Sequence, residues 1–198
     1  QVNGVRERLR VLLVSGEPHP GERVWRNFLK ADPSVDLVHF TILRPPEKQD
    51  ATPVRELSLI AFPIRELFEV KIKEFDLIIF DRYRRRGVLP GIYLENIVRY
   101  VEEGGAVLTA AGPEFATSMS LSSTPLGDIL PGAPTGNVIE RGLKPSITET
   151  GNRHPVTAEL AGSANETTSW GRWFRQVEAT KTRGQTLMNG VDNSPLLI

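Results

Sequence analysis

The stretch FDLIIFDRYRRRGVLPGIYLENIVRYVEEGGAVLTAAG, residues 75–112, decides the fold that this chain is expected to adopt. Its first part, FDLIIFD (75–81), is a nearly continuous apolar run that predicts a buried strand, and a polar loop follows. Residues 91–105 carry apolar side chains at helical spacing and end in a glycine pair, which predicts an amphipathic helix. AVLT (106–109) then predicts a second short strand. Two strands joined by a crossover helix indicate a parallel sheet.

The residues before this stretch repeat the same pattern. LRVLLVSG (9–16) predicts a buried strand, residues 19–32 a helix, and VDLVHFTIL (35–43) a second strand. A Pro-rich and charged loop follows at 44–63, and residues 63–75 predict a further helix. We therefore expect an α/β fold with a doubly wound, mostly parallel sheet of the flavodoxin-like kind.

The pattern weakens after Gly112. Residues 117–153 are dense in Ser, Pro, Gly and Thr, which predicts a loop-rich excursion. Residues 154–198 predict late strands arranged as a short meander. We expect residues 1–198 to form a single α/β domain, excised from a longer chain because it begins at Gln1 and stops within SPLLI (194–198).

Composition excludes several classes of function. Lys and Arg number 24 and Asp and Glu number 24, so the net charge is zero and gives no general reason to expect a nucleic-acid partner. The absence of cysteine excludes disulfides, zinc–thiolate sites and a thiol nucleophile. No phosphate-binding or dinucleotide-binding glycine motif is present, and no spacing matches a strong metal motif, so we assign neither a cofactor nor a metal.

Polar residues follow three of the predicted strands at their carboxyl ends, where doubly wound sheets bind ligands. These positions lie in SGEPHPGE (15–22), DRYRRR (81–86) and TAAGPEF (109–115). The candidate pocket residues are Glu17, His19, Asp81, Arg82, Gly112 and Glu114.

His19 and Arg82 each have an ordinary structural alternative. His19 is the histidine expected to face the crevice, and with Glu17 and Glu22 it could form a weak metal site, but capping of the next helix is favoured. Arg82 and the arginines after it suit phosphate or carboxylate ligands, and equally a solvated loop, a contact with another part of a parent chain, or anionic lipid headgroups. Asp81 and Glu114 are the candidate carboxylates.

FDLIIFDRY and AVLTAAG give the chain a resemblance to the class I glutamine amidotransferase-like superfamily. In active members of that superfamily a strand ends in G-x-C-x-G, and the cysteine lies on a strained turn called the nucleophile elbow. Placing Gly112 on the second glycine puts Ala110 at the cysteine position and Leu108 at the first glycine. The resemblance therefore implies the fold and an elbow-shaped turn, with no catalytic residue, as in a pseudoenzyme.

The run VLLVSGEPHPGERVWRNFLK (11–30), taken with FDLIIFDRYRRRGVLP (75–90), is also similar to alphaproteobacterial membrane proteins of unknown function. In these, a hydrophobic amino-terminal region precedes a soluble domain. The resemblance implies a soluble domain of a bacterial inner-membrane protein on the cytoplasmic side. Its expected partners are other regions of the parent chain or a separate protein, together with a small anionic ligand.

Two classes of function follow from these observations. The first is a non-catalytic amidotransferase-like domain that serves interaction or ligand sensing, which the alanine at the elbow favours. The alternative is a hydrolase or amidotransferase-like enzyme with a non-cysteine site, in which His19, Asp81 and Glu114 act on water or a metal.

Overall fold

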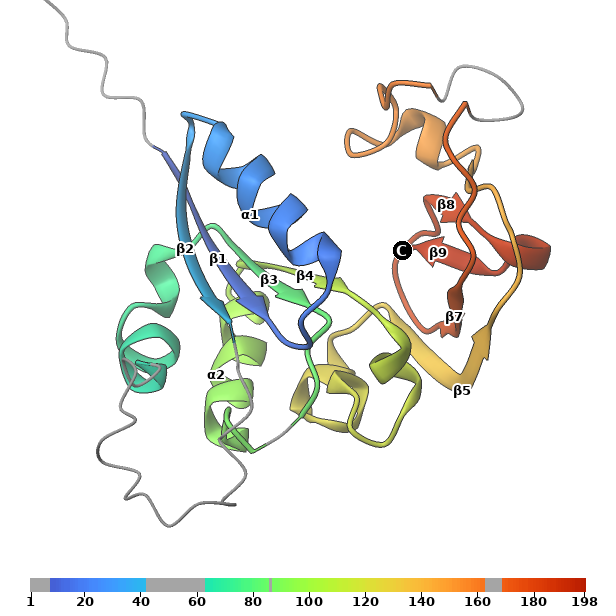
Figure 1. The fold of residues 1–198 in the computed structure, drawn as a ribbon. Coiled ribbons are helices and arrows are strands. Elements are labelled where there is room, and N and C mark those ends of the chain that lie inside the picture. The colour runs from blue at the N-terminus through green and yellow to red at the C-terminus, as the bar shows by residue number, and fades with distance from the viewer. Residues whose placement is uncertain (1–7, 42–62, 86, 163–168) are drawn as a thin grey trace, which may run out of the picture. The chain divides into compact units, whose positions relative to one another are not determined.

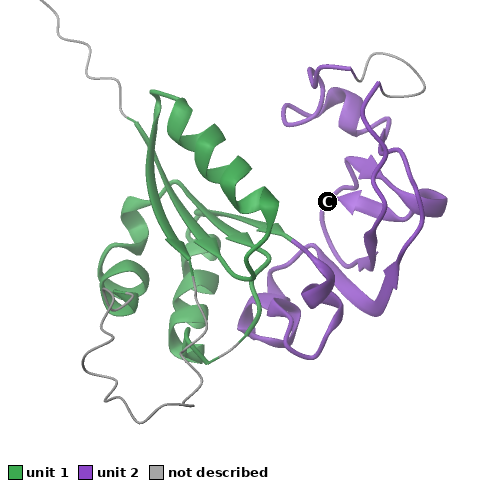
Figure 2. Ribbon diagram, in the orientation of Figure 1, with its two compact units in different colours: residues 1–110 green, residues 111–198 purple. Residues whose placement is uncertain are grey.

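The chain forms two compact units, residues 1–110 and residues 111–198, in the computed structural model (Figure 2). The structure describes residues 8–41, 63–85, 87–162 and 169–198. This division concerns packing and does not measure independent folding, so the single domain expected from the sequence stays a prediction.

The first unit is built on a four-stranded sheet in which every strand pair is parallel (Figure 1). Its strands are β1 (Leu9–Ser15), β2 (Val35–Thr41), β3 (Leu77–Asp81) and β4 (Ala106–Ala110). Their order in the sheet is β2-β1-β3-β4. The α/β class and the parallel sheet predicted from the sequence are confirmed, and the order is compatible with the flavodoxin-like arrangement.

Helices cover both faces of this sheet. The helix α1 (Pro20–Ala31) lies on one face, and α2 (Gly91–Glu102) lies on the other with two short elements, η1 (Glu66–Val70) and η2 (Ile72–Glu74) (Figure 1). The helices α1 and α2 have 12 residues each, and no helix in the described ranges is long and apolar enough to cross a bilayer.

The segment predicted as a helix over residues 63–75 is helical, but it is not one regular α-helix. The chain forms a π-helical turn in η1 and a 3-10 turn in η2 instead. The N–H of Lys71 donates to the carbonyl of Glu66, which closes the wide turn typical of a π-helix. Leu67, Phe68 and Ile72 are buried in these two turns.

Alternate residues of the strands face α1 and form the apolar core of that side. Val11, Leu13 and Ile79 are buried there, and Trp25, Leu29 and Leu108 pack against them. Because side chains alternate along a strand, the next residues on the same face are Ser15, Asp81 and Ala110. The α1 face therefore changes from apolar to polar as it approaches the carboxyl ends of the strands.

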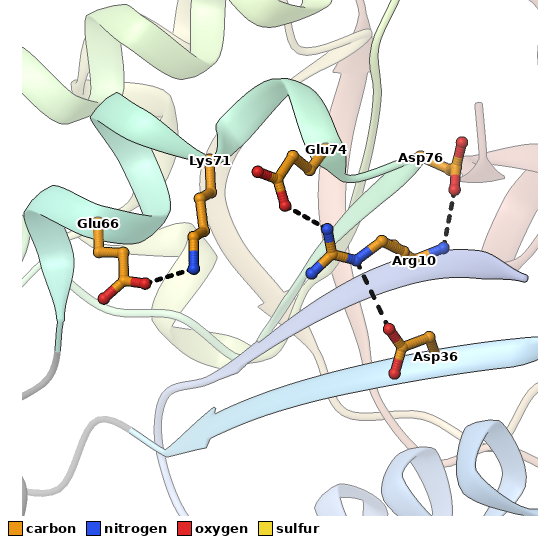
Figure 3. Close-up of polar contacts among 6 residues, drawn as sticks. All are labelled: Arg10, Asp36, Glu66, Lys71, Glu74 and Asp76. Atoms are coloured by element: carbon orange, nitrogen blue, oxygen red, sulfur yellow. Dashed lines mark hydrogen bonds and ion pairs between the residues drawn. The ribbon is translucent and has the colours of Figure 1, made fainter.

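The amino end of the sheet is closed by ion pairs around Arg10 (Figure 3). The Arg10 N–H donates to Asp76 at 2.7 Å, and the guanidinium pairs with Asp36 at 3.5 Å and with Glu74. The side chains of Arg10, Asp36 and Glu74 are only 36%, 51% and 47% exposed, yet still reached by solvent, so the ion pairs contribute a modest alignment of β1, β2 and the start of β3. They lie at the opposite end of the strands from the candidate pocket.

The second unit contains short strands and single 3-10 turns. Two antiparallel arrangements form, β5 with β7 and β6-β8-β9. Its elements are η3 (Pro113–Ala116), η4 (Leu121–Ser123), η5 (Pro125–Asp128), β5 (Gly132–Ile139), β6 (Ser146–Ile147), η6 (Gly151–Arg153), β7 (Gln176–Lys181), β8 (Met188–Asn189), η7 (Val191–Asn193) and β9 (Pro195–Leu197).

The segment predicted as a loop-rich excursion holds an eight-residue strand, β5. Its sequence carries Pro134 between Gly132 and Gly136, so the alternating apolar pattern of a strand is missing. Pro134 also lacks the backbone N–H that would donate a hydrogen bond to the neighbouring strand. The pairing with β7 is irregular between Pro134 and Val138, as expected where a proline enters an edge strand. The late strands lie where the sequence predicted them, although β8 and β9 are shorter, but the predicted meander is wrong: β7 pairs with β5, whereas β8 pairs with β6 and β9.

Candidate functional site

The loops after β1 and β3 meet where the strand order of the sheet reverses. The chain leaves β1 for β2 on one side and returns to β3 on the other, and Ser15 is in register with Asp81. The N–H of Gly16 donates to the Asp81 carbonyl at 2.8 Å, and the N–H of Glu17 donates to the Arg82 carbonyl at 3.0 Å. Doubly wound sheets bind ligands outside such a reversal, so this edge is the candidate site.

The backbones of the two loops approach each other closely at Gly16. A Cβ on Gly16 would lie 2.2 Å from the Arg82 carbonyl oxygen and 2.7 Å from the Cα of Tyr83. Only glycine fits between these atoms. The two loops are therefore held at a fixed separation by the sequence itself.

His19 links the two loops through its side chain. Its Nδ1 accepts a hydrogen bond from the N–H of Gly21 at 3.1 Å, which makes His19 the N-cap of α1. Since Nδ1 accepts, the ring proton is on Nε2, which donates to Asp81 Oδ2 at 2.7 Å. Both ring nitrogens are engaged, and the capping role anticipated from the sequence is present.

Asp81 is a buried carboxylate, with 1% of its surface exposed. Burial raises the pKa of Asp81 above its usual range, while the His19 hydrogen bond and the Arg82 charge oppose part of that rise. The site therefore holds a buried carboxyl group at the end of β3, and the His19 imidazole donates a hydrogen bond to it.

A second cluster of polar side chains lies on the same face of the sheet, and of its members sequence reasoning named only Glu22, as a candidate metal partner of His19. Ser15 Oγ is 3.0 Å from His39 Nε2, and Thr41 Oγ1 donates to Glu22 Oε1 at 2.8 Å. Glu22 Oε1 lies 3.8 Å from the same His39 nitrogen. The alternation of β2 with Leu37, which packs against the core, could have placed residues 39 and 41 on this face.

The Ser15–His39 contact does not form a catalytic triad. In a triad the serine bonds one imidazole nitrogen and the acid bonds the other, which orients the ring as a base. Here the Glu22 carboxylate approaches the nitrogen that already faces Ser15. Ser15 is also only 1% exposed, so its hydroxyl cannot meet a substrate.

Arg82 has an unusual backbone conformation, with φ of 47°. Its N–H donates to the Ala110 carbonyl at 2.9 Å and its own carbonyl accepts from Glu17, so both loops require this geometry. The left-handed region costs a residue other than glycine about 1–2 kcal/mol. The next arginine, Arg84, forms an ion pair with Glu17 at 3.5 Å, and its side chain is 43% exposed.

Ala110 ends β4 in register with Asp81. Because Leu108 packs on the α1 side, alternation puts the Ala110 methyl group on the face that carries His19 and Asp81. A methyl group offers no nucleophile, so the position implied by the resemblance has no chemistry of its own.

Gly112 and Glu114 belong to the second unit. Glu114 lies in η3 and is 8% exposed. The approach of Gly112 and Glu114 to the His19–Asp81 pair stays a prediction. Among the residues that the structure describes, no three histidine or carboxylate side chains are grouped so that they could hold a metal ion.

A groove of about 640 Å³ lies on the α2 side of the first unit. Its lining includes Pro63, Ile64 and Val70, with Pro90 and Tyr93 from the start of α2. It contains none of the candidate pocket residues and lies on the other face of the sheet from His19.

Comparisons of this chain with protein-family models, with curated proteins and with solved structures found no match. The resemblance to amidotransferases therefore stays a prediction.

Proposed function

We propose that the loops after β1 and β3 bind a small anionic ligand, a carboxylate or a phosphate, and that the domain does not catalyse a reaction on it. In this proposal the chain is a non-catalytic amidotransferase-like domain that serves ligand sensing or interaction. The observation that carries the proposal is the arginine-bearing loop after β3, which is hydrogen-bonded through its backbone to the loop after β1.

The partly exposed ion pair of Arg84 with Glu17 supports an exchangeable anion site. At 3.5 Å, with both side chains partly solvated, such a pair contributes about 0–1 kcal/mol. A planar guanidinium matches the oxygens of a carboxylate or phosphate with two parallel hydrogen bonds. An incoming anion can therefore replace Glu17 as the partner of Arg84 at small cost.

The backbone of Arg82 supports the same proposal. Glycine would adopt φ of 47° without strain, yet an arginine stands at this position. The guanidinium also stabilises the buried Asp81 charge at the end of β3. An arginine at a position where it costs some stability fits a residue whose side chain serves the site.

The polar groups at the carboxyl ends of β1 and β3 support a binding role over a catalytic one. His19 uses Nδ1 to cap α1 and Nε2 to bond Asp81, so neither nitrogen is free to accept a proton from water. Ala110 stands where the resemblance would require a thiol. These features position an anion without supplying a nucleophile or a base.

The test is a titration of the ¹⁵N-labelled chain with sulfate and with L-glutamate, followed by amide chemical shifts. Arg84→Gln is expected to weaken binding roughly 10- to 100-fold, the size of a lost charge-assisted hydrogen bond. Glu17→Gln removes the competing carboxylate and is expected to tighten binding by up to about fivefold.

Arg99→Gln is the matched control, since it removes the same charge from α2 on the other face of the sheet. It is expected to leave the affinity unchanged. Equal weakening by Arg84→Gln and Arg99→Gln would show a non-specific charge effect and refute the site. Weaker binding in Glu17→Gln would also contradict the proposal.

The enzymatic alternative rests on the His19–Asp81 contact, which resembles a base held by an acid. It is tested by incubation with L-glutamine and a panel of amides and esters, with ammonia and acid release as readouts. Turnover that is lost in His19→Gln, and retained in Arg99→Gln, would establish the enzyme and overturn the non-catalytic proposal.

We also propose that the domain acts within a longer bacterial membrane protein, with other regions of that chain or a separate protein as partners. The similarity of residues 11–30 and 75–90 to membrane-protein domains supports this context. Membrane fractionation of the full-length gene product, with and without residues 1–198, tests it. Recovery of the full-length product in the soluble fraction would contradict it.

A further inference from the structure

The geometry points to a proton-operated latch, in which His39 on β2 and Glu22 in the first turn of α1 form an ion pair when the imidazole is protonated. The latch lies beside the proposed anion site, and its existence does not depend on that site. Its first consequence is local: it ties the start of α1, which carries His19, to β2.

The distances show a contact that is close but not yet formed. Glu22 Oε1 is 3.8 Å from His39 Nε2, whereas a charge-assisted hydrogen bond spans about 2.7–2.9 Å. The Thr41 hydroxyl donates to the same Glu22 oxygen at 2.8 Å and so competes with His39 for it. His39 Nε2 faces Ser15 Oγ at 3.0 Å, a contact that needs no charge on the ring.

Protonation changes what His39 Nε2 can do. A neutral ring can accept a hydrogen bond from Ser15 at this nitrogen, but a protonated ring can only donate. The nearest anionic acceptor is Glu22 Oε1, so the ring and the carboxylate are drawn together. The side chains are 16% and 20% exposed, so solvent screens the new pair only in part.

The charged groups that face His39 oppose one another. Burial lowers the pKa of His39, Glu22 on α1 and Asp81 on β3 raise it, and Arg26 on α1 lowers it. Their net effect lowers the pKa of His39 below its ordinary value of 6.5. The ring is therefore neutral at neutral pH and gains its proton only below pH 6.5. The latch is therefore open in neutral solution and closes on acidification.

The latch also gives the anion site a pH response, and this part rests on the proposed function. A proton on His39 adds one positive charge to the polar end of the α1 face. Binding of an anion is then expected to tighten below pH 6.5, and by linkage the bound anion raises the pKa of His39.

The test follows the imidazole signals of ¹⁵N- and ¹³C-labelled protein from pH 8 to pH 5, roughly the range over which histidine titrates. His39→Gln assigns the His39 resonance. Glu22→Gln is expected to lower the His39 pKa, Arg26→Gln to raise it, and Glu95→Gln on the exposed side of α2 to leave it unchanged. The Gly21 and Glu22 amides are expected to titrate with His39 in the wild type and not in Glu22→Gln.

Two results would overturn the latch. One is a His39 pKa that is equal in the wild type and in Glu22→Gln. The other is a set of Gly21 and Glu22 amide signals that ignore the His39 titration. If Glu22→Gln fails to fold, Thr41→Val decides, because it releases the carboxylate and is expected to raise the His39 pKa.

A second arm separates the latch from the anion site. Sulfate keeps its charge over this pH range, and its affinity is expected to rise roughly two- to fivefold from pH 7.5 to pH 5.5, as for one screened charge. Glu22–His39 coupling with no sulfate binding at either pH would refute the proposed function and leave the latch standing. Binding that is equal at both pH values would refute the regulation.

Discussion

His19 makes two hydrogen bonds whose contributions can be separated by substitution. The cap on Gly21 N–H is worth about 1 kcal/mol, within a range of about 0.5–2 kcal/mol. The bond to the buried Asp81 carboxylate is charge-assisted and worth about 1.5–3 kcal/mol. His19→Ala removes both, so the free energy of unfolding of the first unit is expected to fall by about 2–5 kcal/mol.

His19→Asn isolates the longer-range bond. Asparagine is among the best N-caps, so it restores the acceptor for the first turn of α1, but it is too short to replace the contact with Asp81. Its cost is expected to be about 1.5–3 kcal/mol, which is roughly 1 kcal/mol less than that of His19→Ala. Asp81→Asn in each background completes a double-mutant cycle for the pair.

The assay is urea unfolding followed by tryptophan fluorescence at pH 7.5. The chain has three tryptophans, and Trp25 on α1 packs against the core of the first unit. Substituting Trp170 and Trp173 by Phe leaves Trp25 as the reporter of that unit. Equal costs for His19→Ala and His19→Asn, or a cost below about 0.5 kcal/mol for His19→Ala, would refute the two-bond reasoning.

Three further predictions follow from the same end of the sheet. Gly16→Ala should destabilise the first unit by roughly 2 kcal/mol or more in urea unfolding, because its Cβ would lie 2.2 Å from a carbonyl oxygen. The control Gly91→Ala has open space around it and should stabilise α2 by about 0.5–1 kcal/mol. If Gly16→Ala is as stable as the wild type, the packing of the two loops is contradicted. Arg82→Gly should raise the free energy of unfolding by about 1 kcal/mol through relief of φ 47° while weakening sulfate binding, and unchanged binding would remove Arg82 from the site. The lowered pKa of His39 contributes stability that is present above pH 6.5 and is lost as the pH falls through the folded-state pKa. The free energy of unfolding should therefore fall with decreasing pH by at most about 1.4 kcal/mol per pH unit from this group, and His39→Gln should reduce that slope. An unchanged slope in His39→Gln would exclude His39 as its source.

The parallel sheet of the first unit could be predicted from the sequence because its signals are local. The strand at 77–81 is a nearly continuous apolar run, the helix at 91–102 carries its own apolar periodicity, and Gly104 and Gly105 mark the end of that helix. The strand at 132–139 could not be predicted, because Pro134 and its flanking glycines hide the alternation that tertiary pairing with β7 restores.

The candidate site shows the same division between local and long-range information. The carboxyl-end positions of His19 and Asp81 follow from strand order, but their contact joins residues 62 apart in sequence. The Ser15–His39 contact depends on the register of β1 with β2, which no local pattern fixes. Gly112 and Glu114 lie in the other unit, so their part in the site stays a prediction.

The most direct test of the central claim is the sulfate titration of the ¹⁵N-labelled wild-type chain at pH 7.5. The proposed anion site predicts saturable shifts of the amides in residues 16–19 and 82–85, with smaller changes along α2. Shifts that do not saturate, or that fall outside these two loops, would contradict an anion site at the carboxyl ends of β1 and β3.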